Sequence, residues 1–192
     1  MGYKKQQLKH TLECADRRRF LGLTALAAAG FMLPPGFAQA QPRGERVLTF
    51  ENLHTGEKLK SVYWANGSYI QTNLADINHI LRDHRTDDVK SIDPALLDLL
   101  HELKLTVDSR KPFAIISGYR SPKTNAMLRA NSGGVAKRSM HLEGRAVDIR
   151  IPGYRLSKLR QAALSLRRGG VGYYPKSGFI HMDTGRIRSW GG

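Results

Sequence analysis

The spacing of apolar and polar residues predicts short strands and helices through most of the chain. Runs rich in β-branched and aromatic residues indicate strands, and apolar positions three and four residues apart indicate helices. The expected strands span 47–50, 59–64, 112–117, 146–151, 171–174 and 179–183. The expected helices span 74–81, 94–103, 122–128 and 155–166. With no internal repeat, these elements predict one α+β domain over residues 41–192, with a small antiparallel sheet and flanking helices.

The helix after Asp93 is the most clearly marked element. An aspartate at this place can accept a hydrogen bond from the first free N–H groups of the helix, and Pro94 suits the first helical position. Leucines then follow at helical spacing: Leu96, Leu97, Leu99, Leu100 and Leu103. They predict an apolar face that packs against the rest of the domain.

Residues 1–40 have the features of an export signal. Two arginines at 17 and 18 precede a 14-residue apolar stretch at 20–33, and the segment ends in Ala-Gln-Ala. This order resembles a twin-arginine signal peptide cleaved after Ala40, and 14 residues are short for a spanning helix. An uncleaved anchor or a basic amphipathic helix is the alternative, although Pro-Pro-Gly at 34–36 breaks any longer helix. We expect a periplasmic domain that has no membrane span after cleavage.

Composition narrows the classes to which this domain can belong. The 192 residues include 31 Lys and Arg, 16 Asp and Glu, and one cysteine. Removal of residues 1–40 leaves 25 basic and 14 acidic residues, a formal net charge of +11, and also removes Cys14. These values exclude a disulfide scaffold and a thiolate metal site. The charge fits anionic wall polymers, peptidoglycan carboxylates or lipid headgroups, and equally a surface that only keeps the domain soluble. An exported domain is not expected to bind nucleic acid.

Three passages hold the residues best suited to chemistry, namely 117–121, 139–148 and 178–183. They contain His141, Asp148 and His181. Imidazole nitrogens and carboxylate oxygens are suitable zinc ligands, and a catalytic zinc site has three protein ligands and a fourth position open to water. These three residues supply that number of ligands.

Strand geometry supports the choice of Asp148 and His181. Successive side chains on a strand point to opposite faces, so each of these residues points away from its apolar neighbours, which face the core. If the two strands are neighbours, His181 stands beside Asp148. His141 then approaches from the loop that precedes the Asp148 strand.

The three passages also carry a family resemblance. Ser-x-His, six residues and Asp in 139–148, with Phe-Ile-His-Met-Asp at 179–183 and Ser-Gly-Tyr-Arg-Ser at 117–121, resembles the zinc peptidases of the D-alanyl-D-alanine carboxypeptidase and murein endopeptidase group. The chain is most similar to the YcbK/MepK-like murein endopeptidases. The resemblance implies an α+β fold of the hedgehog/D-Ala-D-Ala-peptidase type and hydrolysis of peptidoglycan stem peptides. It also implies one zinc ion per chain, held by His141, Asp148 and His181.

The resemblance implies roles for Arg120 and Ser139 as well. The matching arginine of the family faces the substrate, where Arg120 would stabilise developing charge or hold a stem-peptide carboxylate. A buried structural ion pair is the alternative role for Arg120. Ser139, two residues before His141, is expected to contribute a hydrogen bond.

The general base is the point at which the sequence departs from the better-known carboxypeptidases of the group. Those place an Asp or Glu three residues before the last zinc histidine, or a His two residues before it, where this chain has Gly178 and Phe179. Asp183 is the nearest carboxylate on the same strand face. It could act as the base or orient a zinc histidine, and we favour the orienting role. Glu143 is a further carboxylate close to His141 in sequence.

Three functions remain open on the sequence alone. The first is a zinc endopeptidase that cuts stem-peptide crosslinks. The second is a non-catalytic, zinc-stabilised wall-binding module that keeps the ligands but has no base, and the third is a carboxypeptidase that removes terminal D-alanine. The residues before His181 bear on the choice between the first two, and the oligomeric state is not indicated.

Overall fold

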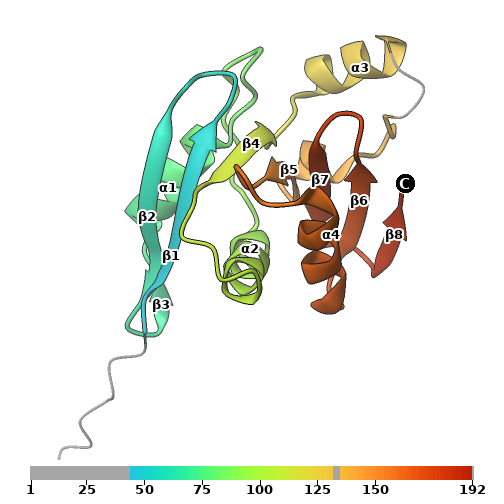
Figure 1. Cartoon of the computed structure of the whole chain (residues 1–192). Helices are drawn as coiled ribbons and strands as arrows, with labels where there is room; N and C mark the ends of the chain where they lie inside the picture. The colour runs from blue at the N-terminus through green and yellow to red at the C-terminus, as the bar shows by residue number, and fades with distance from the viewer. Residues whose placement is uncertain (1–43, 132–134, 192) are drawn as a thin grey trace, which may run out of the picture. The chain divides into compact units, whose positions relative to one another are not determined.

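The computed structural model describes residues 44–131 and 135–191, and their backbone is built around one eight-stranded sheet (Figure 1). The strands are β1 (Arg46–Asn52), β2 (Lys58–Ala65), β3 (Ser68–Tyr69), β4 (Phe113–Ser117), β5 (Ala146–Arg150), β6 (Gly170–Tyr174), β7 (Phe179–Asp183) and β8 (Arg188–Trp190). They lie in the order β3-β2-β1-β4-β5-β7-β6-β8. The helices are α1 (Gln71–Ile80), α2 (Pro94–Thr106), α3 (Pro122–Asn131) and α4 (Leu156–Ser165), and the 3-10 helix η1 (Met140–Glu143) precedes β5.

The pairing of the strands corrects one part of the predicted fold. The α+β class is confirmed, but the sheet is larger than the small antiparallel sheet expected, and it is mixed because β1–β4 and β6–β8 are parallel pairs. β3 and β8 have only two and three residues, too few to show an alternating pattern in the sequence. The β1–β4 pair joins segments that are separated in sequence by two strands and two helices, so no local sequence pattern predicts this pairing.

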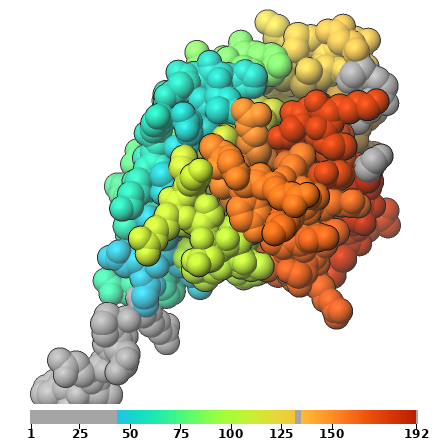
Figure 2. Space-filling model, in the orientation of Figure 1, coloured from blue at the N-terminus to red at the C-terminus, as the bar shows by residue number. Residues whose placement is uncertain are grey.

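α2 is the helix predicted after Asp93. The Asp93 carboxylate accepts a hydrogen bond from the Ala95 N–H at 2.9 Å, Pro94 takes the first helical position, and the five leucines are buried. α2 and α4 contact each other. In Figure 1 they lie in front of the sheet, and in Figure 2 their residues form part of that surface, beside β1 and β2, which stay visible.

One part of the core lies between α4 and the strands β6 and β7 that it contacts. Apolar residues of β5 and β7 join the core that contains Leu159 of α4: Val147, Ile149, Ile180 and Met182. Alternation along each strand therefore places Asp148 and His181 on the face of the sheet away from α4. The predicted strand phase is confirmed for both residues.

The export signal predicted at residues 1–40 lies outside the described residues. Within the described ranges, no helix is both long and apolar enough to cross a membrane.

Candidate metal centre

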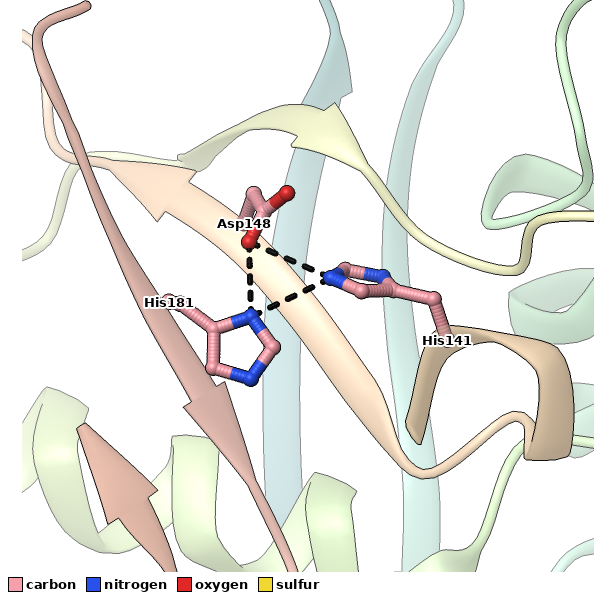
Figure 3. Close-up of side chains that lie close together, drawn as sticks. All are labelled: His141, Asp148 and His181. Atoms are coloured by element: carbon pink, nitrogen blue, oxygen red, sulfur yellow. Dashed lines mark hydrogen bonds and ion pairs between the residues drawn. The ribbon is translucent and has the colours of Figure 1, made fainter. Parts of the chain in front are cut away.

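Three side chains from separate segments point toward one another in Figure 3. His141 comes from η1, Asp148 from β5 and His181 from β7, and one ligand atom of each lies within 4.8 Å of the others. Asp148 and His181 are direct partners in the antiparallel β5–β7 pair. The structure thus brings together the three residues that the sequence predicted as ligands, and all three are buried.

The segment before β5 fixes the orientation of His141. Ser139 is the N-terminal cap of η1, and its Oγ accepts a hydrogen bond from the His141 backbone N–H at 3.3 Å. The His141 Nδ1 lies 2.7 Å from the Gly118 carbonyl oxygen, which can only accept, so Nδ1 carries a proton and donates. A Cβ at Gly118 would lie 2.3 Å from the Leu81 carbonyl oxygen, so this close approach requires glycine. Nε2 of His141 is left facing the cluster.

His181 is held in a similar way by its own strand. Its Nε2 lies 2.9 Å from Oδ2 of Asp183, and the Nε2–H donates to this carboxylate. The other ring nitrogen, Nδ1, lies 2.9 Å from Oδ1 of Asp148 and 3.1 Å from Nε2 of His141. A histidine whose second nitrogen donates to a carboxylate is the usual arrangement behind a metal ligand.

Asp183 is fully buried, and both of its oxygens are occupied. Oδ1 accepts hydrogen bonds from the N–H groups of Gly170 and Gly185 and from Nη1 of Arg188. Oδ2 accepts from His181 and, at 2.6 Å, from Nη2 of Arg188. Burial raises the pKa of Asp183, but the hydrogen bonds from His181 and Arg188 outweigh it and lower this pKa well below its usual range. Asp183 is therefore a weak proton acceptor, and it lies behind the His181 ring.

The charges at the cluster suit a bound cation. Burial lowers the pKa of His141, so its ring is neutral. Burial raises the pKa of Asp148, but His141 and His181 outweigh it and hold this pKa far below its usual range. Burial lowers the pKa of His181, but Asp148 and Asp183 together raise it. Two imidazole nitrogens and an ionised carboxylate thus meet, and this donor set fits zinc, which would replace the proton on Nδ1 of His181.

Arg120 contacts the carboxylate of the cluster. Its Nη2 donates to Oδ2 of Asp148, and its Nε donates to Oγ of Ser117 at 2.8 Å. Oδ1 of Asp148 is left to the two histidines. The Arg120 side chain is 14% exposed and borders the cleft in front of the cluster. The ion pair that the sequence left open as an alternative is therefore present. The same guanidinium also borders the cleft, where a bound molecule could contact it.

A cleft of about 590 Å³ opens onto the cluster. Apart from the three candidate ligands, its walls include three arginines and three aromatic residues: Arg120, Arg138, Arg188, Tyr174, Phe179 and Trp190. Asp148 is the only carboxylate among the described residues that line the cleft. Glu143 is not one of them, and it accepts a hydrogen bond from Arg145 at 3.2 Å.

Sequence reasoning missed the contribution of β8 to this cleft. β6 places Gly172 between His181 of β7 and Trp190 of β8, and a Cβ at Gly172 would lie 2.7 Å from the Trp190 ring. Gly170 stands in the same way beside Asp183 and Arg188. Two glycines at alternate positions of a strand leave room on one face for side chains from neighbouring strands. Gly170 and Gly172 were therefore the sequence feature that could have predicted this contribution.

The α+β fold and the buried His-Asp-His cluster at a cleft define a metallopeptidase. More narrowly, the chain belongs to the family described as peptidoglycan L,D-endopeptidase MepK, whose model matches residues 40–190. This family is one of zinc-dependent peptidases.

Curated relatives agree with this assignment. The peptidoglycan L,D-endopeptidase MepK of Escherichia coli strain K12 is 50% identical over 177 residues, which cover 92% of this chain and 97% of that protein. The protein of the same name from Shigella flexneri gives the same values. The probable peptidoglycan L,D-endopeptidase MepK of Haemophilus influenzae is 40% identical over 179 residues, with 92% and 96% covered. No solved structure gives a significant match.

Proposed function

We propose that this protein is a zinc-dependent endopeptidase that hydrolyses stem-peptide crosslinks of peptidoglycan, at bonds between an L-centre carbonyl and a D-centre amine. The observation that carries the proposal is the cluster of His141, Asp148 and His181 at an open cleft. The family and the names of the relatives support the reaction and the polymer. Those names also favour cleavage within a crosslink over removal of terminal D-alanine.

One zinc ion per chain would be held by Nε2 of His141, Oδ1 of Asp148 and Nδ1 of His181. When bound, zinc supplies a Lewis acid that polarises the scissile carbonyl and lowers the pKa of water at its open position. Arg120 keeps Asp148 turned toward the two histidines. The N–H groups of Arg120 that border the cleft are available to a stem-peptide carboxylate or to developing negative charge.

Asp183 and Ser139 would act through the two histidines. The hydrogen bond from His181 and the lowered pKa of Asp183 support an orienting role for this carboxylate and argue against a general base. Ser139 caps η1 and so places His141. Both residues are positioning residues in this proposal.

The decisive experiment is mass spectrometry of crosslinked muropeptide dimers after incubation with the zinc-loaded protein. We expect each dimer to yield two monomers, one with a new carboxyl end and one with a new amine. Release of D-alanine from intact dimers would show a carboxypeptidase. Dimers that bind but stay intact would show a wall-binding module.

Metal analysis tests the ligands separately. We expect His141→Ala and His181→Ala to lose zinc and activity together, because two protein ligands cannot hold the ion tightly. His79→Ala is the control, since this histidine is exposed at the end of α1. Folded variants at 141 and 181 that retain the wild-type zinc content would refute the site.

We also propose that residues 1–40 direct the chain to the periplasm by the twin-arginine route, because paired arginines precede a short apolar stretch. Replacing Arg17 and Arg18 together with Lys should leave the precursor in the cytoplasm, as shown by fractionation and immunoblotting. Lys9→Arg, which leaves the pair intact, should be exported normally. Normal export of the double variant would contradict the proposal.

A further inference from the structure

Tyr174 borders the cleft on the same side of the sheet as the cluster. In the β6–β7 pair, Gly172 is the partner of His181, and Tyr174 follows two residues later on β6. Side chains two residues apart on a strand share a face, so Tyr174 and His181 lie on the same face. The Tyr174 side chain borders the cleft, and its ring stacks on Phe179 with 4.7 Å between ring centroids.

The Tyr174 hydroxyl has one fixed partner and one unused proton. Nε1 of Trp190 lies 2.8 Å from the phenol oxygen, and because an indole N–H can only donate, the phenol oxygen accepts. Among the described residues, no acceptor takes the phenol proton. This proton is therefore available to a molecule bound in the cleft.

Trp190 is held firmly enough to orient this hydroxyl. Its ring centroid lies 5.2 Å from that of His181, and the Arg188 guanidinium lies 4.9 Å above it. Arg188 is fixed in turn by its two hydrogen bonds to Asp183. A chain of contacts thus runs from the residues that hold His181 to the phenol of Tyr174.

Hydrolysis of a peptide bond builds negative charge on the former carbonyl oxygen, and donors that are fixed in advance stabilise this charge. Arg120 is one such donor, although two of its nitrogens already donate to Asp148 and Ser117, and Arg188 donates to Asp183. We infer that the Tyr174 hydroxyl donates a hydrogen bond to the oxygen of the scissile carbonyl as its charge develops, and that Trp190 orients that hydroxyl. The inference rests on the proposed function and adds a catalytic residue to it.

Tyr174→Phe tests the inference, because it removes the hydroxyl and keeps the ring. We expect kcat to fall by about 100-fold, the effect of losing one oxyanion donor, with KM within about twofold of wild type. Affinity for a phosphinate isostere of the scissile bond, which mimics the tetrahedral state, should fall by a similar factor, while zinc content and Tm stay unchanged. Tyr173→Phe is the matched control, since the adjacent tyrosine packs against the core on the other face.

A double-mutant cycle tests the orienting role of Trp190. Trp190→Phe removes the N–H and should lower kcat by itself, but should cause no further loss when Tyr174→Phe is already present. Additive losses would refute the orienting role. If Trp190→Phe lowers Tm, its kcat no longer reports on orientation alone, and the Tyr174→Phe result then decides whether the hydroxyl is catalytic.

The outcomes separate this inference from the function on which it rests. Wild-type protein that leaves crosslinked dimers intact would refute the endopeptidase itself. Active wild-type protein with an equally active Tyr174→Phe variant would refute only the role of Tyr174. Equal weakening of substrate and phosphinate binding, with kcat unchanged, would show that Tyr174 only holds the substrate and would also overturn the inference.

Discussion

Each candidate ligand presents one atom to the cluster while a second atom is held from behind. The Gly118 carbonyl accepts from the far nitrogen of His141, and Asp183 accepts from the far nitrogen of His181. Arg120 donates to the second oxygen of Asp148. Three chemically different partners therefore fix three ligands, which reduces the reorganisation needed when a metal binds.

Arg120→Lys should separate the metal-site role of this residue from a role on the substrate. Lysine keeps the charge but cannot donate to Asp148 and Ser117 with the same planar group. We expect zinc affinity to fall by about 10- to 100-fold, measured by competition with a chelator. Arg138→Lys is the control. Arg138 borders the same cleft but makes no hydrogen bond to His141, Asp148 or His181, so this variant should bind zinc normally. Unchanged zinc affinity with a reduced kcat would confine Arg120 to the substrate.

The ligands could be predicted from the sequence because ligand chemistry and strand phase are local properties. Asp148 and His181 interrupt apolar strands with period two, which identified their shared face before their pairing was known. The contact between Arg120 and Asp148 depends on the β4–β5 pairing, and local spacing does not encode it. The role of Trp190 was missed for the same reason.

β6 shows how two glycines on one face of a strand shape the cleft. Gly172→Ala should lower the free energy of unfolding by about 1–3 kcal/mol, because the added Cβ would lie 2.7 Å from the Trp190 ring and must displace it. Urea unfolding measures the loss. Gly44→Ala is the control, since a Cβ there meets nothing within 4 Å. Wild-type stability of Gly172→Ala would show that β8 moves aside at no cost.

Asp83 joins the loop after α1 to the start of α3. This buried carboxylate accepts hydrogen bonds from the N–H groups of Ser121 at 2.8 Å and Arg85 at 3.0 Å. Burial raises the pKa of Asp83, but the hydrogen bonds from Arg85 and Ser121 oppose it, and the pKa is lowered to about 2. The ionised form is thus favoured by folding.

A lowered pKa in the folded state has a defined effect on stability. Asp83 stabilises the fold above its unfolded pKa of about 4, and this contribution, about 2 kcal/mol, is lost as the pH falls toward 2. Asp83→Asn should therefore reduce the decline in unfolding free energy between pH 4 and pH 2. Asp76→Asn, on the exposed side of α1, serves as the control. An identical decline in wild type and Asp83→Asn would contradict this account.

The elements themselves were predictable to different degrees. α2 followed directly from Asp93, Pro94 and the leucine spacing, because capping and amphipathic periodicity are local. η1 was expected only as a loop, since four residues of 3-10 helix carry no period. The predicted size of the sheet and the predicted antiparallel direction of all its strands were wrong, because strand order depends on contacts between distant segments.

The stability of the protein should depend on zinc, because the cluster joins η1, β5 and β7, and no cysteine is present after residue 14 to crosslink them. A ligand that binds only the folded state stabilises it by about 2.7 kcal/mol at 100 times its Kd, which raises Tm by about 5 to 10 °C for a domain of this size. Calorimetry of the metal-free protein with and without added zinc measures this shift. The same zinc addition should leave the Tm of His141→Ala nearly unchanged, because that variant lacks one of the three ligands. An equal rise in both proteins would mean that zinc stabilises the fold somewhere other than this cluster.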